Sequence, residues 1–299
     1  MPVLENLQLN FDSTSLIVLN IVLAIVMYGI ALDLEIEDFK RVVLEPKAVL
    51  VGLGSQLLLL PAMTFLLTVV ADPAPSLALG MILVAACPGG NMSNFFTHYS
   101  KGNAGLSITM TSIVTIGAVV LTPLNLTIWG SLRPDTKAIL TDVHLDPLRM
   151  MSIVFLIIIV PIALGIWTRA RRKELAERMV KPFKTASLVI FAAFIVIALA
   201  NNSEQFVNHI HRVFFLVLLH NGLAFLTGYL VATLSGLEEA DRRAITVEVG
   251  IQNSGLGLVL VFNFFAGLGG MALVAAWWGV WHLISGLGLG TFWARSAPE

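Results

Sequence analysis

The chain has 299 residues, of which 57% are hydrophobic and only 12% are charged, and its net charge is −1. A soluble domain carries about 25% charged residues, so this composition excludes an ordinary soluble protein. The lack of a basic helical stripe argues against nucleic-acid binding, and the single cysteine, Cys87, excludes an internal disulfide and a multi-cysteine metal site.

Residues 1–14 contain Glu5 and Asp12 but no lysine or arginine. A cleavable secretion signal begins with a positively charged region, which is missing here. We therefore expect residues 1–14 to form an external segment that precedes the first membrane helix.

Long apolar segments follow, and a bilayer core needs about 20 apolar residues per helix. These segments predict an all-α polytopic membrane protein with nine transmembrane helices. The predicted spans are 15–32, 47–70, 75–98, 104–130, 150–168, 185–202, 211–234, 244–266 and 269–293. The last two are separated only by Gly267 to Gly269, because the charge-free stretch between Glu248 and Arg295 is too long for one helix.

Basic residues fix the predicted orientation, because they gather on the cytoplasmic side of a membrane protein. Nine spans place 14 of the 18 lysines and arginines on one side, namely Lys40, Arg41, Lys47, Lys101, Arg169, Arg171, Arg172, Lys173, Arg178, Lys181, Lys184, Arg242, Arg243 and Arg295. The other side receives Arg133, Lys137, Arg149 and Arg212. We therefore expect an external N-terminus and a cytoplasmic tail at residues 294–299.

Two predicted spans carry glycine, asparagine and serine in mid-membrane, where an ordinary helix would be apolar. One cluster is Pro88–Asn94 in the third span, and the other is Glu248–Gly255 in the eighth. Gln56 in the second span and His220–Asn221 in the seventh precede them at similar places. The first to fourth spans thus match the sixth to ninth in the opposite orientation. Paired interrupted helices in an inverted repeat indicate the binding site of a transporter.

The interruptions have a specific chemical consequence. Glycine and proline unwind a helix and release backbone carbonyls and amides, which survive in a membrane only inside protein or along a cavity. Released carbonyls suit a hard cation, and helix N-termini suit an anion. The alternative, close helix packing, is the better interpretation of the lone glycines in 279–290, but packing needs no Asn, Gln or Glu.

Glu248 is the acidic residue that lies clearly inside a predicted span. A carboxylate at this depth is costly and marks a functional site. Its helix offers no lysine or arginine nearby, so a bound cation is the natural counter-charge. Two alternatives stay open, a neutral Glu248 hydrogen-bonded to a neighbouring helix and a Glu248 at the aqueous end of its span.

Four neutral polar residues are candidate partners of that cation. Ser93 and Asn94 lie at the third-span interruption, and Ser107 and Thr111 share one face of the fourth span. Each hydroxyl alone could simply bond its own helix. Together they supply neutral oxygens, the ligand type that Na⁺ prefers.

Histidines lie in or near the predicted membrane region at positions 98, 220 and 282. A lone histidine on a helix is more often a hydrogen-bonded core residue than a proton relay. Proton coupling through His98 or His282 nevertheless remains an alternative to sodium coupling.

At these clusters the sequence resembles the bile acid:sodium symporter family, over nearly the whole chain and in the same order. The most specific matching string is Glu248–Leu256. Other matching stretches are Gly90–Asn94, Lys101–Thr111, Leu219–Gly222 and Trp281–His282.

The resemblance implies a core domain at 47–130 and 211–293, which contains two unwound crossing helices at 75–98 and 244–266, and a panel domain at 15–32 and 149–202. It also implies two sodium sites with Glu248 in both. The first would use Ser93, Asn94, Ser107, Thr111 and Glu248, and the second Gln56, Glu248, Val249, Ile251 and Gln252. The substrate would lie beside the crossing, near Asn91, Asn253 and His282.

Three features depart from the family pattern. Many bacterial relatives have ten spans, whereas this chain has nine predicted ones. Asn91 stands where relatives often have Thr, and Leu283 follows His282 where relatives often have Asn. Both substitutions fall near the expected substrate region, so sodium coupling is the firmer expectation.

These expectations combine into a sodium-coupled symporter of a small organic anion, in which panel and core move to alternate access. We expect a monomer in a bacterial inner membrane, without enzymatic activity, an organic cofactor or nucleic acid. Candidate substrates are bile acids, pantothenate-like acids, keto acids and sulfonated anions. Alternatives are a uniporter of the same fold, an intramembrane enzyme and a channel, and the sequence has neither a Gly-x-Ser-x-Gly nor a His-Glu-x-x-His motif.

Overall fold

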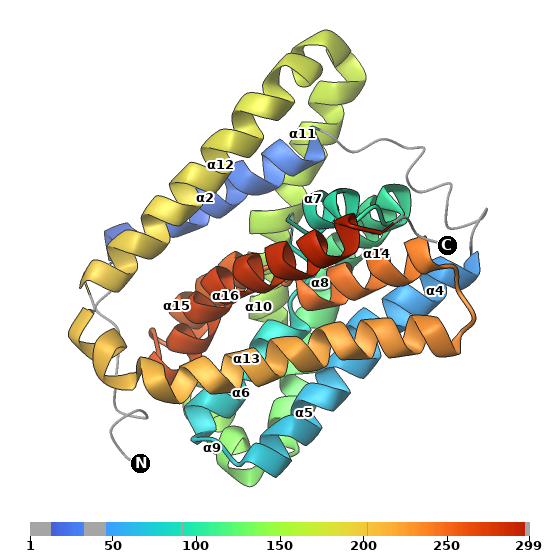
Figure 1. Ribbon diagram of the computed structural model, residues 1–299. Helices are drawn as coiled ribbons and strands as arrows, with labels where there is room; N and C mark the ends of the chain where they lie inside the picture. The colour runs from blue at the N-terminus through green and yellow to red at the C-terminus, as the bar shows by residue number, and fades with distance from the viewer. Residues whose placement is uncertain (1–12, 33–45, 91, 202, 297–299) are drawn as a thin grey trace.

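The computed structural model describes residues 13–32, 46–90, 92–201 and 203–296. Within these ranges the regular structure is helical, apart from one isolated β-bridge (Figure 1). The predicted all-α class is confirmed. Most of the segment 1–14, the basic junction with Lys40 and Arg41, and the end of the tail at 297–299 lie outside the described residues.

The helices follow one another along the chain with short connections. They are α2 (Ser13–Ala31), α4 (Pro46–Gly54), the π-helical η1 (Ser55–Leu59), α5 (Leu60–Ala71), α6 (Pro75–Ala86), α7 (Met92–Tyr99), α8 (Ala104–Ser131), α9 (Pro134–Asp142), α10 (Pro147–Val154), the π-helical η2 (Phe155–Ile159), α11 (Val160–Arg171), α12 (Lys173–Asn201), α13 (Ser203–Leu234), α14 (Glu239–Gly250), α15 (Ser254–Phe264) and α16 (Gly269–Ala294). Helix lies along each predicted span.

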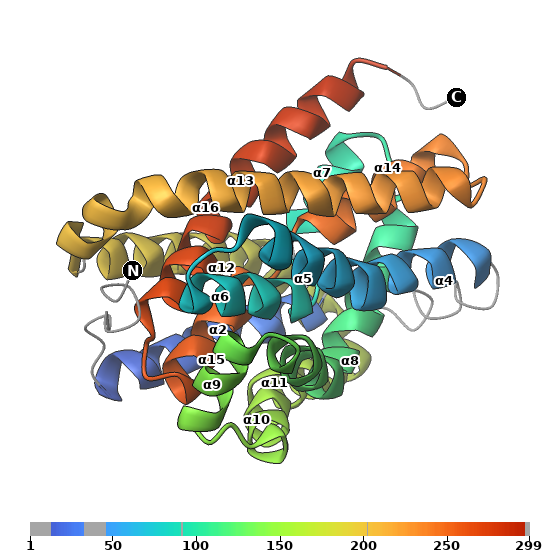
Figure 2. The same ribbon diagram turned by 90° about the horizontal axis from the view of Figure 1, so that it is seen from below.

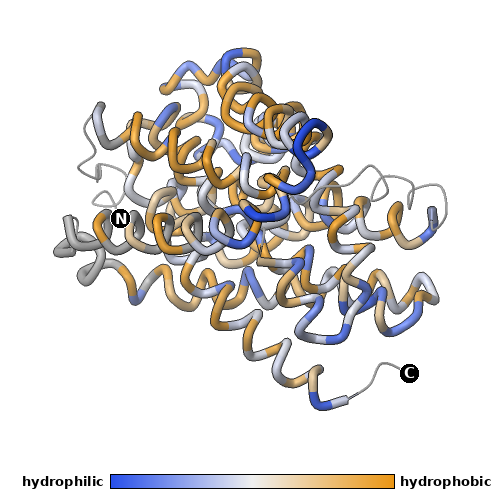
Figure 3. The backbone as a smooth tube through the Cα atoms, turned by 90° about the horizontal axis from the view of Figure 1, so that it is seen from above, coloured by the Kyte–Doolittle hydropathy of each residue, from blue (hydrophilic) through white to orange (hydrophobic). Residues whose placement is uncertain are grey.

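Among the described residues, five continuous helical segments are long and apolar enough to cross a bilayer, at Pro46–Ala71, Ala104–Ser131, Pro147–Arg171, Val213–Leu234 and Gly269–Ala294. Shorter apolar helices cover Leu16–Ala31, Pro75–Ala86 and Ser254–Phe264. Hydrophobic residues extend along most of the helical tube in Figure 3. The chain is therefore a polytopic membrane protein, and the count of nine spans stays a prediction.

Helix extends beyond the predicted spans at three places. The predicted loop 131–149 contains α9, which begins at Pro134, a residue suited to a first helical turn. The predicted loop 203–210 is the first part of α13. Helix α12 begins at Lys173 rather than near residue 185, because hydropathy marks only the apolar part of a helix, whereas its charged residues are also good helix formers.

The predicted boundary between the last two spans is confirmed. Helix α15 ends at Phe264, and α16 begins at Gly269. Gly267 has a φ of +70° in the connecting turn, a conformation that glycine adopts without steric cost.

Both π-helical segments precede a proline. Pro61 and Pro161 each occupy the first turn of the α-helix that follows, and proline cannot donate to the carbonyl four residues earlier. For Pro61 that carbonyl belongs to Leu57, and Asn125 of α8 donates its side-chain amide to it at 3.2 Å. The sequence therefore creates an irregular turn and supplies its missing donor from another helix.

Helices α2, α11 and α12 pack against one another along one side of the molecule (Figure 1). A Cβ on Gly165 of α11 would lie 2.5 Å from Cβ of Ala31 in α2, so glycine permits this close approach. The Tyr28 hydroxyl donates to Thr168 Oγ1 at 3.1 Å, and Arg169 donates to the carbonyl of Leu32 at 2.8 Å.

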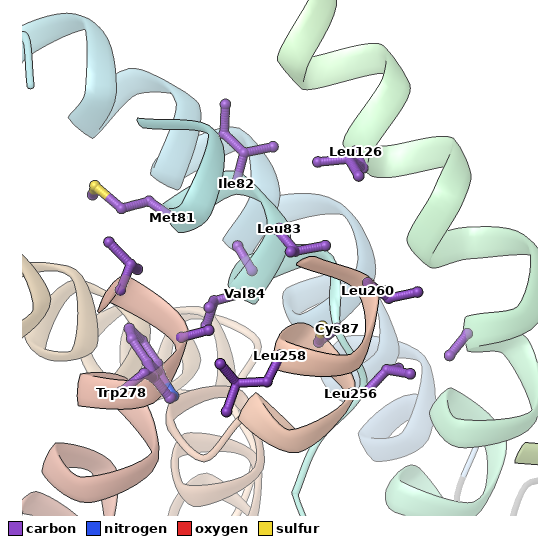
Figure 4. Packing of buried hydrophobic residues seen from close by; sticks show 14 of the residues in the cluster. Met81, Ile82, Leu83, Val84, Cys87, Leu126, Leu256, Leu258, Leu260 and Trp278 are labelled. Atoms are coloured by element: carbon purple, nitrogen blue, oxygen red, sulfur yellow. The ribbon is translucent and has the colours of Figure 1, made fainter. Parts of the chain in front are cut away.

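The central core lies among α6, α15 and α16, where every residue of α6 from Ser76 to Ala86 is buried. Figure 4 shows Leu83, Leu258 and Trp278 of these helices within one apolar cluster. Helices α6 and α16 approach closely, since a Cβ on Gly80 would lie 2.8 Å from Cα of Met271. Helix α6 ends and helix α15 begins inside the protein, and α16 packs against both of them (Figure 2).

Two arginines, Arg243 and Arg133, each join the ends of several helices through hydrogen bonds. Arg243 is 3% exposed and donates to the carbonyls of Ser100, Trp293 and Ser296, which ties the ends of α7 and α16 to α14. The basic-residue pattern assigns Arg243 only to the cytoplasmic side, and its burial shows a structural role as well.

Arg133 joins α5 to the start of α9. It donates to the carbonyl of Thr68, to Asp72 Oδ1 at 3.1 Å and to Asp135 at 2.6 and 3.0 Å. These bonds hold the pKa of the Asp135 carboxyl below its usual range, because the Arg133 guanidinium favours the charged form.

We predict that Arg133→Ala lowers the unfolding temperature of the purified protein by several degrees. A hydrogen bond to a charged group contributes about 1.5–3 kcal/mol, and Arg133 makes several. The matched control is Arg149→Ala, since Arg149 is exposed. Equal unfolding temperatures for the two variants would contradict this assignment.

Candidate functional site

The chain between α6 and α7 is unwound inside the protein. Helix α6 ends at Ala86, and Cys87 has an extended ψ of 156°. Pro88, Gly89 and Gly90 follow, and a new helix begins at Met92. Pro88 cannot donate to a helical carbonyl, which explains why the helix stops here.

Helices α14 and α15 are interrupted in the same way, and the two interruptions contact each other. The Gly90 amide donates to the carbonyl of Ile251 at 2.7 Å, and the Asn253 amide donates to the carbonyl of Pro88 at 2.8 Å. Gly89 and Gln252 form an antiparallel bridge. The two unwound segments therefore satisfy part of each other's backbone where they cross.

Four further carbonyls near the crossing accept hydrogen bonds from side chains. The donors and acceptors are Thr122 to Ala86 at 2.7 Å, Gln56 to Cys87 at 3.3 Å, Gln252 to Val249 at 2.6 Å and Asn221 to Gly250 at 2.8 Å. An unpaired backbone group in a membrane costs several kcal/mol, so these four side chains make the interruptions tolerable.

Glu248, in the last turn of α14, is 0% exposed. Its carboxylate accepts a hydrogen bond from Ser107 at 3.0 Å and from Thr111 at 2.8 Å, both on α8. In the described part of the chain no lysine or arginine forms an ion pair with it. The alternative of Glu248 at an aqueous helix end is therefore wrong, whereas the hydrogen bonds to the neighbouring helix α8 that the other alternative requires are present.

Asn94 of α7 completes this cluster and gives it an excess of acceptors. Asn94 Oδ1 lies 2.8 Å from Ser107 Oγ and 3.2 Å from Thr111 Oγ1. Each hydroxyl has one proton to donate, yet each faces both this amide oxygen and the carboxylate. Oxygen lone pairs therefore outnumber the protons available to them, which is the electrostatic condition for binding a cation.

The structure brings together every residue predicted for the first sodium site. Ser93 Oγ lies 3.5 Å from Thr111 Oγ1 and completes the set. Helices α7, α8 and α14 contribute to it, and it consists of Ser93, Asn94, Ser107, Thr111 and Glu248.

Four of the five residues predicted for the second site lie together at the crossing, namely Gln56, Val249, Ile251 and Gln252. Gln56 and Gln252 exchange side-chain amide bonds of 2.8 and 3.2 Å. The carbonyl of Val249 accepts from Gln252, and that of Ile251 accepts from Gly90. The carboxylate of Glu248 is bonded within the first group.

The three predicted substrate residues have different surroundings. Asn91 lies outside the described residues. The side-chain oxygen of Asn253 accepts a hydrogen bond from the Leu256 amide at 3.0 Å and so caps α15. The side-chain nitrogen of Asn253 is therefore the group available to an anion. The His282 side chain is buried, and its Nδ1 has no hydrogen-bond partner among the described residues.

A shallow, open surface region lies further along α16. Its lining is mostly apolar, with one cationic side chain, and comprises Ile284, Leu287, Gly288, Thr291, Phe292 and Arg295. Such a surface combines apolar contact with one positive charge.

Sequence reasoning missed several side chains that support the site. Thr97 donates to Ser107 Oγ at 3.3 Å, and Thr122 and Asn221 bond the interrupted helices as described above. Asn221 was noticed as a mid-membrane polar residue, but its partner could not be inferred. Thr97 and Thr122 gave no signal, because a threonine in a membrane helix usually bonds its own turn.

Two features define the class of this protein. Its helices α6 and α14 end inside the protein, and a buried carboxyl group lies among neutral oxygens where the unwound segments cross. This is the class of membrane transporters built on interrupted helices.

Comparison with known proteins agrees with this class. Residues 20–209 match the model of the sodium bile acid symporter family, and the chain belongs to this family. It is 31% identical to the uncharacterized sodium-dependent transporter YocS of Bacillus subtilis (strain 168), over 94% of this chain and 84% of that protein.

Two eukaryotic proteins are also similar. The probable sodium/metabolite cotransporter BASS1, chloroplastic, of Arabidopsis thaliana is 30% identical over 93% of this chain and 67% of its own length. The hepatic sodium/bile acid cotransporter of Rattus norvegicus is 28% identical over 81% of this chain and 66% of its own length. The expectation of a sodium-dependent transporter rather than an enzyme is confirmed by this family membership.

We predict that Gly89→Ala abolishes stabilisation by sodium while the protein still folds. The added Cβ would lie 2.1 Å from Glu248 Oε1, so the flexible carboxylate must leave Ser107 and Thr111. The measurement is the unfolding temperature in sodium against potassium chloride, since a ligand that binds the folded state raises it.

Gly54→Ala is the matched control, because a Cβ there has no heavy atom within 4 Å. It should keep the wild-type response to sodium. A wild-type response in Gly89→Ala would show that the position of this carboxylate does not matter.

Proposed function

We propose that the protein is a symporter that couples the entry of Na⁺ to the uptake of a small organic anion. The observation that carries this proposal is the buried carboxylate of Glu248 among oxygens that have more lone pairs than protons. A sodium ion would supply the missing positive charge, and hard cations prefer such oxygen ligands.

Two sodium ions are proposed, one on each side of the crossing. The first would contact Glu248, Asn94 and the α8 hydroxyls. The second would contact Gln56, Gln252 and the carbonyls of Val249 and Ile251. Because Gln56 and Gln252 bond each other, this ion would have to replace those amide bonds.

The two sites are coupled through α14. Glu248 and Val249 are consecutive in its last turn, so the position of one group fixes that of the other. Sodium at the first site would hold Glu248 and thereby stabilise the conformation in which the second set of oxygens is assembled. Binding shifts the population toward a conformation only through such differential contacts.

The organic anion is proposed to bind beside the crossing. The N-terminus of α15 at Ser254 presents backbone amides with a partial positive charge, and the amide nitrogen of Asn253 is adjacent. Asn91 and His282 are proposed to complete the site.

The substrate class is inferred from this chemistry and from the relatives. An amide-lined, half-apolar site suits a bile acid or a pantothenate-like or keto acid. The names of similar proteins include bile acid and metabolite cotransport, which supports an organic anion.

Alternating access is proposed to move one group of helices relative to the other. The panel would be α2, α10–α11 and α12, which pack against each other. The core would be α4–α8 and α13–α16, which contain both interruptions. We also propose that the protein has nine spans and an external N-terminus, and that it acts as a monomer in the bacterial inner membrane.

Proton coupling and uniport are the alternatives within the same fold. His98 is exposed, and the His282 imidazole is buried, with no hydrogen-bond partner for its Nδ1 among the described residues. Neither histidine belongs to the acceptor-rich group, which favours sodium.

We predict that Glu248→Ala abolishes sodium-driven uptake in proteoliposomes, because the first cation loses its charged ligand. A panel of labelled organic anions should be tested with an inward sodium gradient, with a potassium gradient and with a pH gradient. The wild type should take up at least one anion with sodium alone.

Glu238→Ala is the control, since this exposed glutamate lies just before α14. It should transport like the wild type. Uptake driven by a pH gradient and indifferent to sodium, or full sodium-driven uptake by Glu248→Ala, would contradict the proposal.

A further inference from the structure

The carbonyl of Gly250 is the last one in α14 before the chain unwinds. It lies one residue after Val249 and two after Glu248, the residues proposed above as sodium ligands. Asn221 of α13 donates its side-chain amide to this carbonyl at 2.8 Å, and both residues are buried. The end of α14 is thus attached to a neighbouring helix.

The direction of the Asn221 amide is itself fixed. Ser285 of α16 donates its hydroxyl to Asn221 Oδ1 at 2.6 Å. With the oxygen held by this hydroxyl, the nitrogen must face Gly250. Three helices, α13, α14 and α16, therefore meet in one chain of hydrogen bonds.

The other interrupted helix has the same arrangement. Gln56, on the helix before α6, donates to the carbonyl of Cys87, which follows the last residue of α6. The separations along the chain are similar, 31 residues for Gln56 and Cys87 and 29 for Asn221 and Gly250. In both halves a side-chain amide from the preceding span binds the carbonyl at the interruption.

The first half uses a glutamine, Gln56, and the second half a shorter asparagine, Asn221, because the helices of the second half pack more closely. A Cβ on Gly228 of α13 would lie 2.9 Å from Cα of Thr246, and one on Gly250 would lie 2.2 Å from the Phe225 ring. These two glycines bring α13 and α14 together. The shorter asparagine can therefore reach the carbonyl, whereas the first half uses a glutamine.

We propose that Asn221, oriented by Ser285, is a positioning residue that sets the sodium affinity of the crossing. It holds the end of α14, so that Glu248 on one side and the Val249–Gln252 segment on the other keep the arrangement that binds cations. Asn221 itself contacts no ion. This inference rests on the proposed sodium sites.

The test measures equilibrium binding of ²²Na⁺ to purified protein as a function of sodium concentration. Asn221→Leu has a similar shape but removes both hydrogen bonds. It should raise the half-saturating sodium concentration roughly tenfold, which corresponds to the loss of one buried hydrogen bond, and lower the Hill coefficient toward one.

Ser285→Ala should shift the curve in the same direction by a smaller factor, because the amide keeps its donor but loses its orientation. The double variant should bind sodium as Asn221→Leu does, since Ser285 acts through Asn221. Should Asn221→Leu fail to fold, the shift in Ser285→Ala decides the question.

Thr227→Val is the matched control. Thr227 is a buried polar residue of the same helix, and it bonds only its own turn, donating to Leu223 at 2.7 Å. Its sodium curve should equal that of the wild type. Wild-type curves in folded Asn221→Leu or Ser285→Ala protein would overturn this inference alone, whereas a wild type that binds no sodium would overturn the proposed function.

Discussion

Backbone carbonyls released inside a membrane protein must find donors within the protein, because lipid supplies none. The interruptions after α6 and α14 release such groups from two helices at one place. Part of the demand is met by the bridge between Gly89 and Gln252, and a further part by side chains of η1, α8 and α13. The positions of these helices are consequently tied to the crossing, and so is the geometry of the candidate site.

The candidate site is acidic, and among the described residues no lysine or arginine forms an ion pair with its carboxyl group. A lysine or arginine near Glu248 would neutralise it permanently, whereas hydroxyl and amide oxygens leave the charge to be balanced by a mobile ion. Ser107 and Thr111 hold the Glu248 side chain in place through hydrogen bonds and bring no charge of their own. A transporter needs this reversibility, because its ion has to be released after each cycle.

The interruptions and most members of the site could be predicted from the sequence, since glycine, proline, asparagine and glutamate are unexpected in mid-membrane. The gathering of Ser93, Asn94, Ser107 and Thr111 around Glu248 followed from one family resemblance and from helical spacing. The start of α12 at Lys173 and helix α9 could not be predicted, because hydropathy reports apolar length and not helix length. The roles of Arg243 and Asn221 were also missed, because their partners lie on helices distant in sequence, and only the packing decides which carbonyls they reach.

The most direct test of the central claim is to locate a heavy analogue of the monovalent cation. Crystals of the protein soaked in Tl⁺ should give an anomalous peak in contact with Glu248, Asn94 and the hydroxyls of Ser107 and Thr111, and added Na⁺ should weaken it. A map without a peak at this cluster, in a protein whose α6–α7 and α14–α15 interruptions are intact, would contradict the account.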